Sequence, residues 1–227
     1  MHKFAVLLAA GSLALSACAG PVAAAEEPVN TPAATRVAKE KPGLKTAIFA
    51  GGCFWGVEGV FSHVKGVTGA VSGYHGGTAK TAKYDIITSG VTTHAESVKV
   101  TYDPAVVRYD QLLRIYFAVI ADPTLKNRQG PDVGAHYRTA IVPMNAEQSA
   151  VAAAYIAQLG KAKLWSKPIV TKIEPYKAFY AAEDYHQDFM LNNPKHGYIL
   201  RWDAPKVAAL KAMFPKLYRA TFLKDAG

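Results

Sequence analysis

A single cysteine in a glycine-rich turn is the residue best suited to chemistry in this chain. Cys53 lies in the segment Gly51-Gly52-Cys53-Phe54-Trp55-Gly56, and the chain contains only one other cysteine, Cys18. Cys18 falls in a segment typical of an export signal, so Cys53 is expected to be the only free thiol of the mature chain. A lone thiol forms no internal disulfide and is either reactive or inert. The small and aromatic neighbours of Cys53 favour a reactive thiol.

The residues around Cys53 predict a turn between a strand and a helix. Residues 46–50 are an apolar run, and the two glycines end it. Apolar side chains then recur at helical spacing, at Phe54, Val57, Phe61 and Val64. The unpaired N–H groups and positive dipole at a helix start should lower the pKa of Cys53. Neighbouring helical residues face roughly 100° apart, so at least one of Phe54 and Trp55 should line a site.

Periodicity elsewhere predicts a layered domain. Residues 96–102 alternate between apolar and polar and predict a half-buried strand with Glu96 at its start. Further elements are expected as helices at 112–120, 145–160 (with Asn145 as N-cap) and 201–218, and as strands at 137–142 and 169–173. Strands and helices that intermix without strict alternation indicate a single α+β domain with a mixed or antiparallel central sheet flanked by helices.

The glycine-rich segment resembles the active-site motif of the A-type peptide methionine sulfoxide reductases. The resemblance extends over about residues 46–198. It continues, in order, through Gly73-Tyr74-His75-Gly76-Gly77, Tyr84, His94-Ala95-Glu96, Asp122-Pro123-Thr124, Arg128-Gln129-Gly130-Pro131-Asp132, Tyr137-Arg138 and Ala182-Glu183-Asp184-Tyr185-His186-Gln187. With this resemblance, the expected fold is a plait of the ferredoxin-like type with a C-terminal helical extension.

The resemblance implies a nucleophile and an apolar wall. A sulfoxide needs an apolar surface for its methyl group, donors for its oxygen and a nucleophile that faces its sulfur. By resemblance, Phe54 and Trp55 form the wall and bind substrate, and Cys53 attacks the sulfur. The expected activity is thiol-dependent reduction of methionine S-sulfoxide, free or in proteins, as protein repair. The intermediate would be a sulfenic acid on Cys53.

The resemblance also implies the groups that handle the oxygen. Glu96, protonated and with a raised pKa, would act with the hydroxyls of Tyr84 and Tyr137 to hold and protonate it. Asp132 matches a position near the family site and would orient the other groups. No cofactor and no metal ion are expected, because the histidines lack zinc-ligand spacing.

This chain departs from the family pattern at the expected resolving cysteine. Many members carry one near the C-terminus, but the stretch Lys195-His196-Gly197-Tyr198-Ile199 has none. An external thiol, either small or on a thioredoxin-like partner, must then reduce Cys53. Ala121, where His is usual, and His136, where Gln is common, affect fine tuning rather than the chemistry.

The N-terminus predicts export. Residues 1–18 read as a signal peptide that ends in the lipobox-like Leu15-Ser16-Ala17-Cys18, which makes Cys18 a lipidation candidate; cleavage after Ala25 is the alternative. The protein is therefore expected in the bacterial periplasm or as a membrane-anchored lipoprotein, in contact with a membrane only through that anchor. Residues 19–44 are polar and predict a disordered tether, 45–218 the reductase domain and 219–227 a tail.

Charge and composition leave few other function classes. The net charge of +9 is scattered, which indicates a solvated surface and no nucleic-acid partner, and a monomer is expected. A membrane-tethered cysteine redox sensor or a thiol peroxidase is the enzymatic alternative. A tethered protein that binds oxidised methionine is the non-enzymatic one, and it would not need the sulfur of Cys53.

Overall fold

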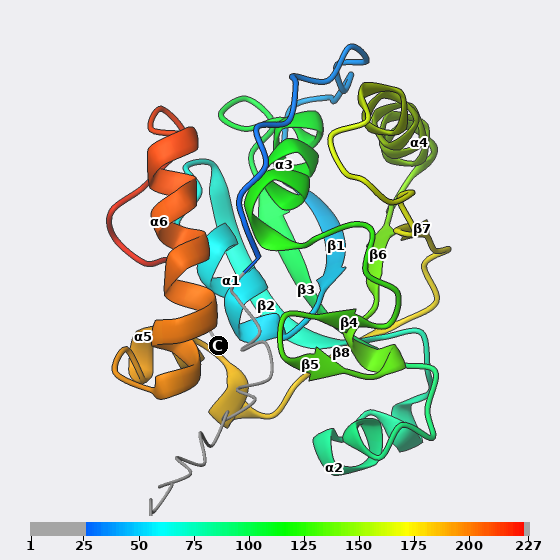
Figure 1. The fold of residues 1–227 in the computed structure, drawn as a ribbon, viewed down its shortest axis with the longest axis vertical. Coiled ribbons are helices and arrows are strands. Elements are labelled where there is room, and N and C mark those ends of the chain that lie inside the picture. The colour runs from blue at the N-terminus through cyan, green and yellow to red at the C-terminus, as the bar shows by residue number, and fades with distance from the viewer. Residues whose placement is uncertain (1–25, 225–227) are drawn as a thin grey trace, which may run out of the picture.

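A six-stranded sheet forms the centre of the protein in the computed structural model, which describes residues 26–224 (Figure 1). Its order is β7-β6-β1-β3-β2-β8, and neighbouring strands are antiparallel except β6 and β7. The strands are β1 (Lys45–Gly51), β2 (Val67–His75), β3 (Ala95–Tyr102), β6 (Thr139–Val142), β7 (Lys172–Ile173) and β8 (Phe179–Ala181). A separate ribbon pairs β4 (Arg128–Gln129) with β5 (Asp132–Val133).

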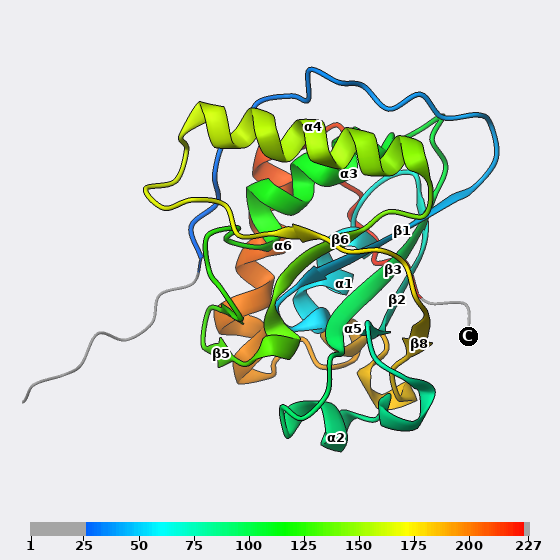
Figure 2. The same cartoon turned by 90° about the vertical axis from the view of Figure 1, so that its right-hand side faces the viewer.

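The helices connect and cover this sheet (Figure 2). They are α1 (Phe54–Ser62), α2 (Tyr84–Thr88), α3 (Tyr109–Ile115), α4 (Ala146–Ala162), α5 (Phe189–Asn192) and α6 (Ala204–Met213). Two π-helical turns, Tyr116–Ile120 and Ile199–Asp203, follow α3 and precede α6. Within residues 26–224, no helix has both the length and the apolar character to cross a bilayer.

The chain order explains how Cys53 is placed. The four central strands lie in the order β6-β1-β3-β2 in the sheet. Along the chain, α1 connects β1 to β2, and α3 lies between β3 and β6. Each helix therefore connects two parallel strands that are separated by a third strand. The turn from β1 into α1, which carries Cys53, lies beside the start of β3, which carries Glu96. The predicted α+β domain with a mixed central sheet and flanking helices is confirmed.

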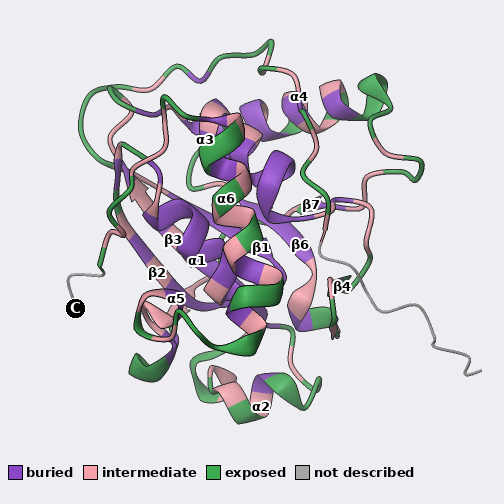
Figure 3. Ribbon diagram, turned by 60° about the vertical axis from the view of Figure 1, so that its left-hand side comes forward, coloured by how far each residue is buried: buried purple, intermediate pink, exposed green. Residues whose placement is uncertain are grey.

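One apolar core joins the sheet to the helices (Figure 3). At its centre, the ring of Phe49 in β1 lies 4.9 Å from Phe61 in α1 and 5.6 Å from Tyr116 after α3. All three side chains are fully buried, and burial stabilises each by about 1.5–3 kcal/mol. This packing holds α1, the helix that follows Cys53, against the sheet.

The predicted elements are largely present, with shifts at their ends. Asn145 caps α4 as expected, by accepting a hydrogen bond from Gln148 N at 2.9 Å. The strand predicted at 137–142 starts only at Thr139, after a 3₁₀ turn (Ala135–Tyr137), and the one at 169–173 shrinks to β7. β3 is not half-solvated at its start, where Glu96 and Ser97 are both buried. The C-terminal helix ends at Met213, because Pro215 disfavours helical geometry at the preceding residue.

The predicted disordered tether is wrong for residues 26–44, which we call the N-terminal segment. The segment packs along α3 and α4 (Figure 2). Thr31 is 1% and Ala38 6% exposed, and Glu40 accepts hydrogen bonds from Tyr102 Oη at 2.6 Å and Tyr109 N at 3.0 Å. Partners in the domain thus satisfy its polar groups. Residues 19–25 of the predicted tether, the signal peptide with Cys18 and tail residues 225–227 lie outside the described residues.

Candidate active site

Cys53 is the N-cap of α1, and the turn before it requires glycine. Gly52 has a φ of +87°, and a Cβ there would lie 2.5 Å from Cβ of Gln129. The Cys53 side chain is partly buried and forms no disulfide bond. The N–H of Trp55 interacts with its sulfur. Among residues 26–224, Cys53 is the only cysteine. The sequence therefore fixes the thiol at the position where a helix offers its free N–H groups.

Glu96, in β3, lies beside the Cys53 thiol. Its side chain is 2% exposed, and Oε2 accepts a hydrogen bond from Phe54 N at 3.0 Å. Burial raises the pKa of Glu96 to about 8, and the charges of Asp132 and Asp203 add to this effect, while the Phe54 N–H opposes it. At neutral pH Glu96 is therefore largely protonated and is able to donate a proton.

Two tyrosines interact electrostatically with Glu96 and Cys53. Tyr84 starts α2, where its N–H donates to Glu183 Oε1 at 2.9 Å. Burial first, and Glu96 second, raise the pKa of Tyr84 to about 12; the same two causes raise the pKa of Tyr137 above its usual value. Both hydroxyls therefore stay protonated and remain hydrogen-bond donors at neutral pH.

Phe54 and Trp55 divide between core and site. Phe54 is 1% exposed, and its ring lies 4.9 Å from that of His186. Trp55 is partly exposed and stacks on Phe189 at 3.6 Å, while its Nε1 donates to His186 Nδ1 at 3.1 Å. The Trp55 ring also meets Tyr198 edge-on at 5.8 Å. Of the two aromatics, Trp55 is thus the more accessible to a ligand.

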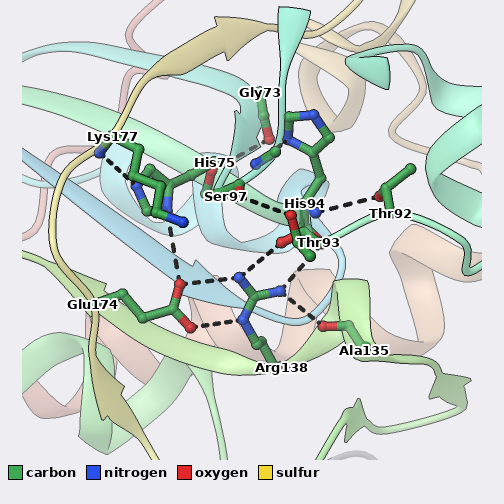
Figure 4. Close-up of polar contacts among 12 residues, drawn as sticks. Gly73, His75, Thr92, Thr93, His94, Ser97, Ala135, Arg138, Glu174 and Lys177 are labelled. Carbon is green, nitrogen blue, oxygen red and sulfur yellow. Dashed lines mark hydrogen bonds and ion pairs between the residues drawn. The ribbon is translucent and has the colours of Figure 1, made fainter. Parts of the chain in front are cut away.

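Arg138 fastens the strand start that carries Glu96 to the turn that carries Tyr137 (Figure 4). Its guanidinium pairs with Glu174 at 2.7 and 2.9 Å and donates to the carbonyls of Thr93, His94 and Ala135. A bidentate arginine–carboxylate pair is strong and fixes geometry. This contact fixes the start of β3, which carries Glu96, against the 3₁₀ turn that carries Tyr137.

Asp132 lies across a small cavity that Cys53 also lines. Tyr198 Oη donates a hydrogen bond to the Asp132 carboxyl. Burial raises the pKa of Asp132, whereas Tyr198, Lys206 and His136 lower it. The cavity is further lined by Glu26, Gln129, Gly130, Pro131, Tyr198, Trp202 and Lys206.

Asp203, the last residue of the π-helical turn before α6, is a second buried carboxyl that packs against the start of α1. It is 0% exposed, and among residues 26–224 neither of its oxygens has a hydrogen-bond partner; Lys206 Nζ is 4.0 Å away. A Cβ on Gly56 would lie 2.2 Å from its Oδ1, so the carboxyl touches the first turn of α1. Burial raises the pKa of Asp203 to about 7.

The prediction that the helix start lowers the pKa of Cys53 is wrong. Burial raises the pKa of the thiol well above its usual value, and Glu96, Asp203 and Asp132 raise it further. The N–H of Trp55 opposes these effects only in part. Several acidic groups share one helix terminus, and the dipole does not offset burial.

Comparison with known proteins identifies the family. Residues 45–217 match the family model of peptide methionine sulfoxide reductase. A Mesorhizobium japonicum protein named peptide methionine sulfoxide reductase MsrA 2 is 58% identical over 180 residues, which cover 79% of this chain and 92% of that protein. The chain belongs to the peptide methionine sulfoxide reductase family. Its activity is the reduction of methionine sulfoxide as a peptide-methionine (S)-S-oxide reductase.

Further relatives agree with this assignment. The peptide methionine sulfoxide reductase MsrA of Deinococcus radiodurans is 48% identical over 168 residues, 74% of this chain and 81% of that protein. The reductase also resembles the structure of methionine sulfoxide reductase A from Corynebacterium diphtheriae, with a TM-score of 0.57, 31% identity and coverage of 75% and 88%. Mxr1 from Saccharomyces cerevisiae in reduced form gives a TM-score of 0.61 at 30% identity, with coverage of 70% and 91%.

Sequence reasoning missed several residues that lie close to the thiol of this reductase. His186 falls in a quoted motif but received no role, although it contacts both Phe54 and Trp55. Tyr198 ends the resemblance, and Asp203 and Glu26 lie beyond it. Only the aromatic-rich run around His186 carried a signal. Within residues 26–224, no group of three or more His, Cys, Asp or Glu side chains is arranged to hold a metal ion.

Proposed function

We propose that the chain reduces methionine S-sulfoxide, both free and in proteins, through a sulfenic acid on Cys53. The observation that carries this mechanism is the hydrogen bond from Phe54 N to Glu96. Phe54 directly follows Cys53, so this bond holds a largely protonated carboxyl close to the nucleophile. Tyr84 and Tyr137 supply two protonated hydroxyls to the same site. Trp55, beside His186 and Phe189, offers the apolar wall for the substrate methyl group.

The proposed reductive step is balanced without a cofactor. Cys53 Sγ forms a bond to the sulfoxide sulfur while Glu96 protonates the sulfoxide oxygen. The oxygen then moves to Cys53, the new sulfur–sulfur bond breaks and methionine leaves. The thiol proton replaces the one that Glu96 gave, so the sulfoxide and the thiol become a thioether and a sulfenic acid. Because the resting thiol has a raised pKa, attack requires its proton to leave as the substrate binds.

We propose that two external thiols complete the cycle. The first attacks the sulfenic acid, forms a mixed disulfide and releases water, and the second regenerates the Cys53 thiol. Cys53 is the only cysteine in the described part of the chain, and the stretch 195–199, where many family members are expected to carry a resolving cysteine, contains none. The donor would be a small thiol or a thioredoxin-like protein, and we propose that the enzyme acts as a monomer.

We also propose that the enzyme is exported. The apolar run before Cys18 and the lipobox-like ending support acylation at Cys18, with cleavage after Ala25 as the other route. The protein would then be periplasmic or held to a membrane only by its acyl chains. Acyl anchoring predicts retention on membranes in high salt, because salt does not screen it. A mature protein that starts at Glu26 would contradict acylation.

The strand order supports the ferredoxin-like plait that we propose for the core. Strands β6-β1-β3-β2 and helices α1 and α3 follow the order β-α-β-β-α-β along the chain. α6, which packs beside α1, would be the C-terminal addition to it.

The decisive experiment compares the mature wild-type protein with the Cys53→Ser variant. Each is incubated with methionine S-sulfoxide or the R epimer, with dithiothreitol as reductant, and methionine is quantified. Wild type should reduce the S epimer and leave the R epimer essentially untouched, because a fixed methyl wall and fixed donors present one face of the chiral sulfur. Cys53→Ser should be inactive. Equal rates on both epimers, or no methionine formed from the S epimer, would contradict the proposal.

A further inference from the structure

Glu26, in the N-terminal segment, reaches the cavity that contains Cys53. Its side chain is 14% exposed. Oε1 accepts a hydrogen bond from Gly130 N at 2.7 Å, and Oε2 lies 3.8 Å from Lys206 Nζ. The residue lies outside the segment 45–217 that matches the family model. The family resemblance therefore assigns no role to it.

The two partners of Glu26 both line this cavity and come from different parts of the fold. Gly130 lies in the turn between β4 and β5, two residues before Asp132. Lys206 lies on α6, and its Nζ is also 4.0 Å from the buried Asp203 carboxyl. Glu26 therefore links the turn that carries Asp132 to the helix that follows Asp203.

The turn is also held by the pairing of β4 with β5 and by Arg128, whose guanidinium donates to Gly130 O at 3.1 Å. Asp132 itself is held by Tyr198, whose hydroxyl donates to its carboxyl. Gly130 has a φ of +49°, and Glu26 is the side chain that satisfies its N–H. Without this acceptor, a partly buried N–H would lose its hydrogen bond, which is unfavourable. Loss of this hydrogen bond should allow the turn to shift, and Asp132, two residues further on, should shift with it.

We propose that Glu26 is a positioning residue of the active site, which holds the Asp132 turn against α6 through the N–H of Gly130. The inference rests on the proposed function, because it assumes that Asp132 and Tyr198 border the bound sulfoxide. Glu26 does not touch the reacting atoms and acts through the turn. Its effect should therefore fall on substrate binding more than on the chemical step.

The test compares Glu26→Ala, Glu26→Gln and the matched control Glu27→Ala. Glu27 is its exposed neighbour in the same segment. Steady-state kinetics with methionine S-sulfoxide and dithiothreitol give KM and kcat, and thermal unfolding gives Tm. Glu26→Ala should raise KM about fivefold to thirtyfold and change kcat less than about threefold. Glu26→Gln keeps an oxygen for the Gly130 N–H and should remain within about threefold of wild type. Glu27→Ala should match wild type.

Three outcomes would overturn the inference. One is an unchanged KM in Glu26→Ala. Another is an equal loss in Glu26→Ala and Glu26→Gln, which would mean that the hydrogen bond to Gly130 is irrelevant. The third is a fall in kcat that follows a fall in Tm while KM stays constant, which would mean that Glu26 only stabilises the fold. An inactive wild type would instead contradict the proposed function, so the two failures are distinguishable.

Discussion

The Glu96 carboxyl and the backbone N–H of Phe54 are joined by a 3.0 Å hydrogen bond. This contact ties the start of β3 to the first turn of α1, one residue after Cys53. In the proposed mechanism, this contact holds the proton donor Glu96 next to the nucleophile Cys53. Such preorganisation lets a proton transfer occur without a rearrangement of the site.

Glu96→Gln tests the acid role directly. The amide still fits beside Phe54 N but has no transferable proton. The reductive step should slow by roughly 10²–10⁴, the usual contribution of a general acid. Single-turnover release of methionine, measured by rapid quench without added thiol, reports this step alone. Near-normal release would remove Glu96 from the acid role.

The pH dependence of the enzyme should follow the pKa of Glu96, which burial raises from 4.5 to about 8. The folded protein binds this proton more tightly than the unfolded chain does. The resulting stabilisation is fully present below the unfolded pKa and is lost as the pH rises through about 8. Tm should therefore fall as the pH rises from 4.5 to about 8. The single-turnover rate should fall as Glu96 loses its proton near the upper end of that range. Glu96→Gln should lose less stability over it than wild type, and parallel curves would contradict the assignment.

Asp203→Asn should make the Cys53 thiol easier to ionise. The Asp203 charge is one of the causes that raise the pKa of Cys53, and an amide carries no charge. Alkylation of Cys53 by iodoacetamide at pH 8 should be faster in this variant by at least about threefold. Asp85→Asn is the control, because Asp85 is exposed on α2. Equal alkylation in all three proteins would show that Asp203 does not act on the thiol.

Gly56→Ala should destabilise the protein because the new Cβ would lie 2.2 Å from Oδ1 of the buried Asp203. Overpacking of this kind costs about 1–3 kcal/mol, which lowers Tm by about 2–4 °C for each kcal/mol in a chain of this size. Gly160→Ala is the matched control within α4, where a Cβ meets nothing within 4 Å. It should stabilise by about 0.5–1 kcal/mol. If both variants unfold at the wild-type temperature, the packing of Asp203 on α1 is not as described.

One turnover without reductant should leave a sulfenic acid on Cys53. The mature chain is expected to hold no second thiol for an internal disulfide, so one methionine should be released per chain. A sulfenic-specific probe, read by peptide mass spectrometry, should label Cys53. Monothiols should support turnover, and excess oxidant should convert Cys53 to the irreversible sulfinic acid. Two methionines per chain, or an intramolecular disulfide, would contradict this mechanism.

Local pattern was sufficient to predict the elements that present the thiol. The glycine pair after an apolar run and the 3.6-residue spacing after Cys53 correspond to β1 and α1, and Asn145 caps α4 as predicted. The resemblance to the family also selected Glu96, Tyr84, Tyr137 and Asp132, all of which interact electrostatically at one site. These features depend on residues close in sequence or on recognised motifs.

The features that were not predicted depend on distant partners. The N-terminal segment is polar and has no periodicity. Its hydrogen bonds nevertheless reach distant residues: Ala38 N donates to Asp110, 72 residues away, and Ala33 O accepts from Gln158, 125 residues away. The pKa of Cys53 is raised partly by Asp203, which lies on a different element near the other end of the chain. No local rule places either contact, because packing and burial decide both.

The course of the N-terminal segment determines what its end presents to the thiol. Because Glu26 lines the cavity that Cys53 also lines, a group attached to the backbone nitrogen of Glu26 is tethered close to the thiol. A tether of ten extended residues spans at most about 35 Å. A peptide on such a short tether has an effective concentration in the millimolar range near the site. A peptide fused there would compete with free substrate, and an oxidised methionine within it would become an intramolecular one. By contrast, Leu223 N donates a hydrogen bond to the carbonyl of Ser62, the last residue of α1, at the opposite end of that helix from Cys53.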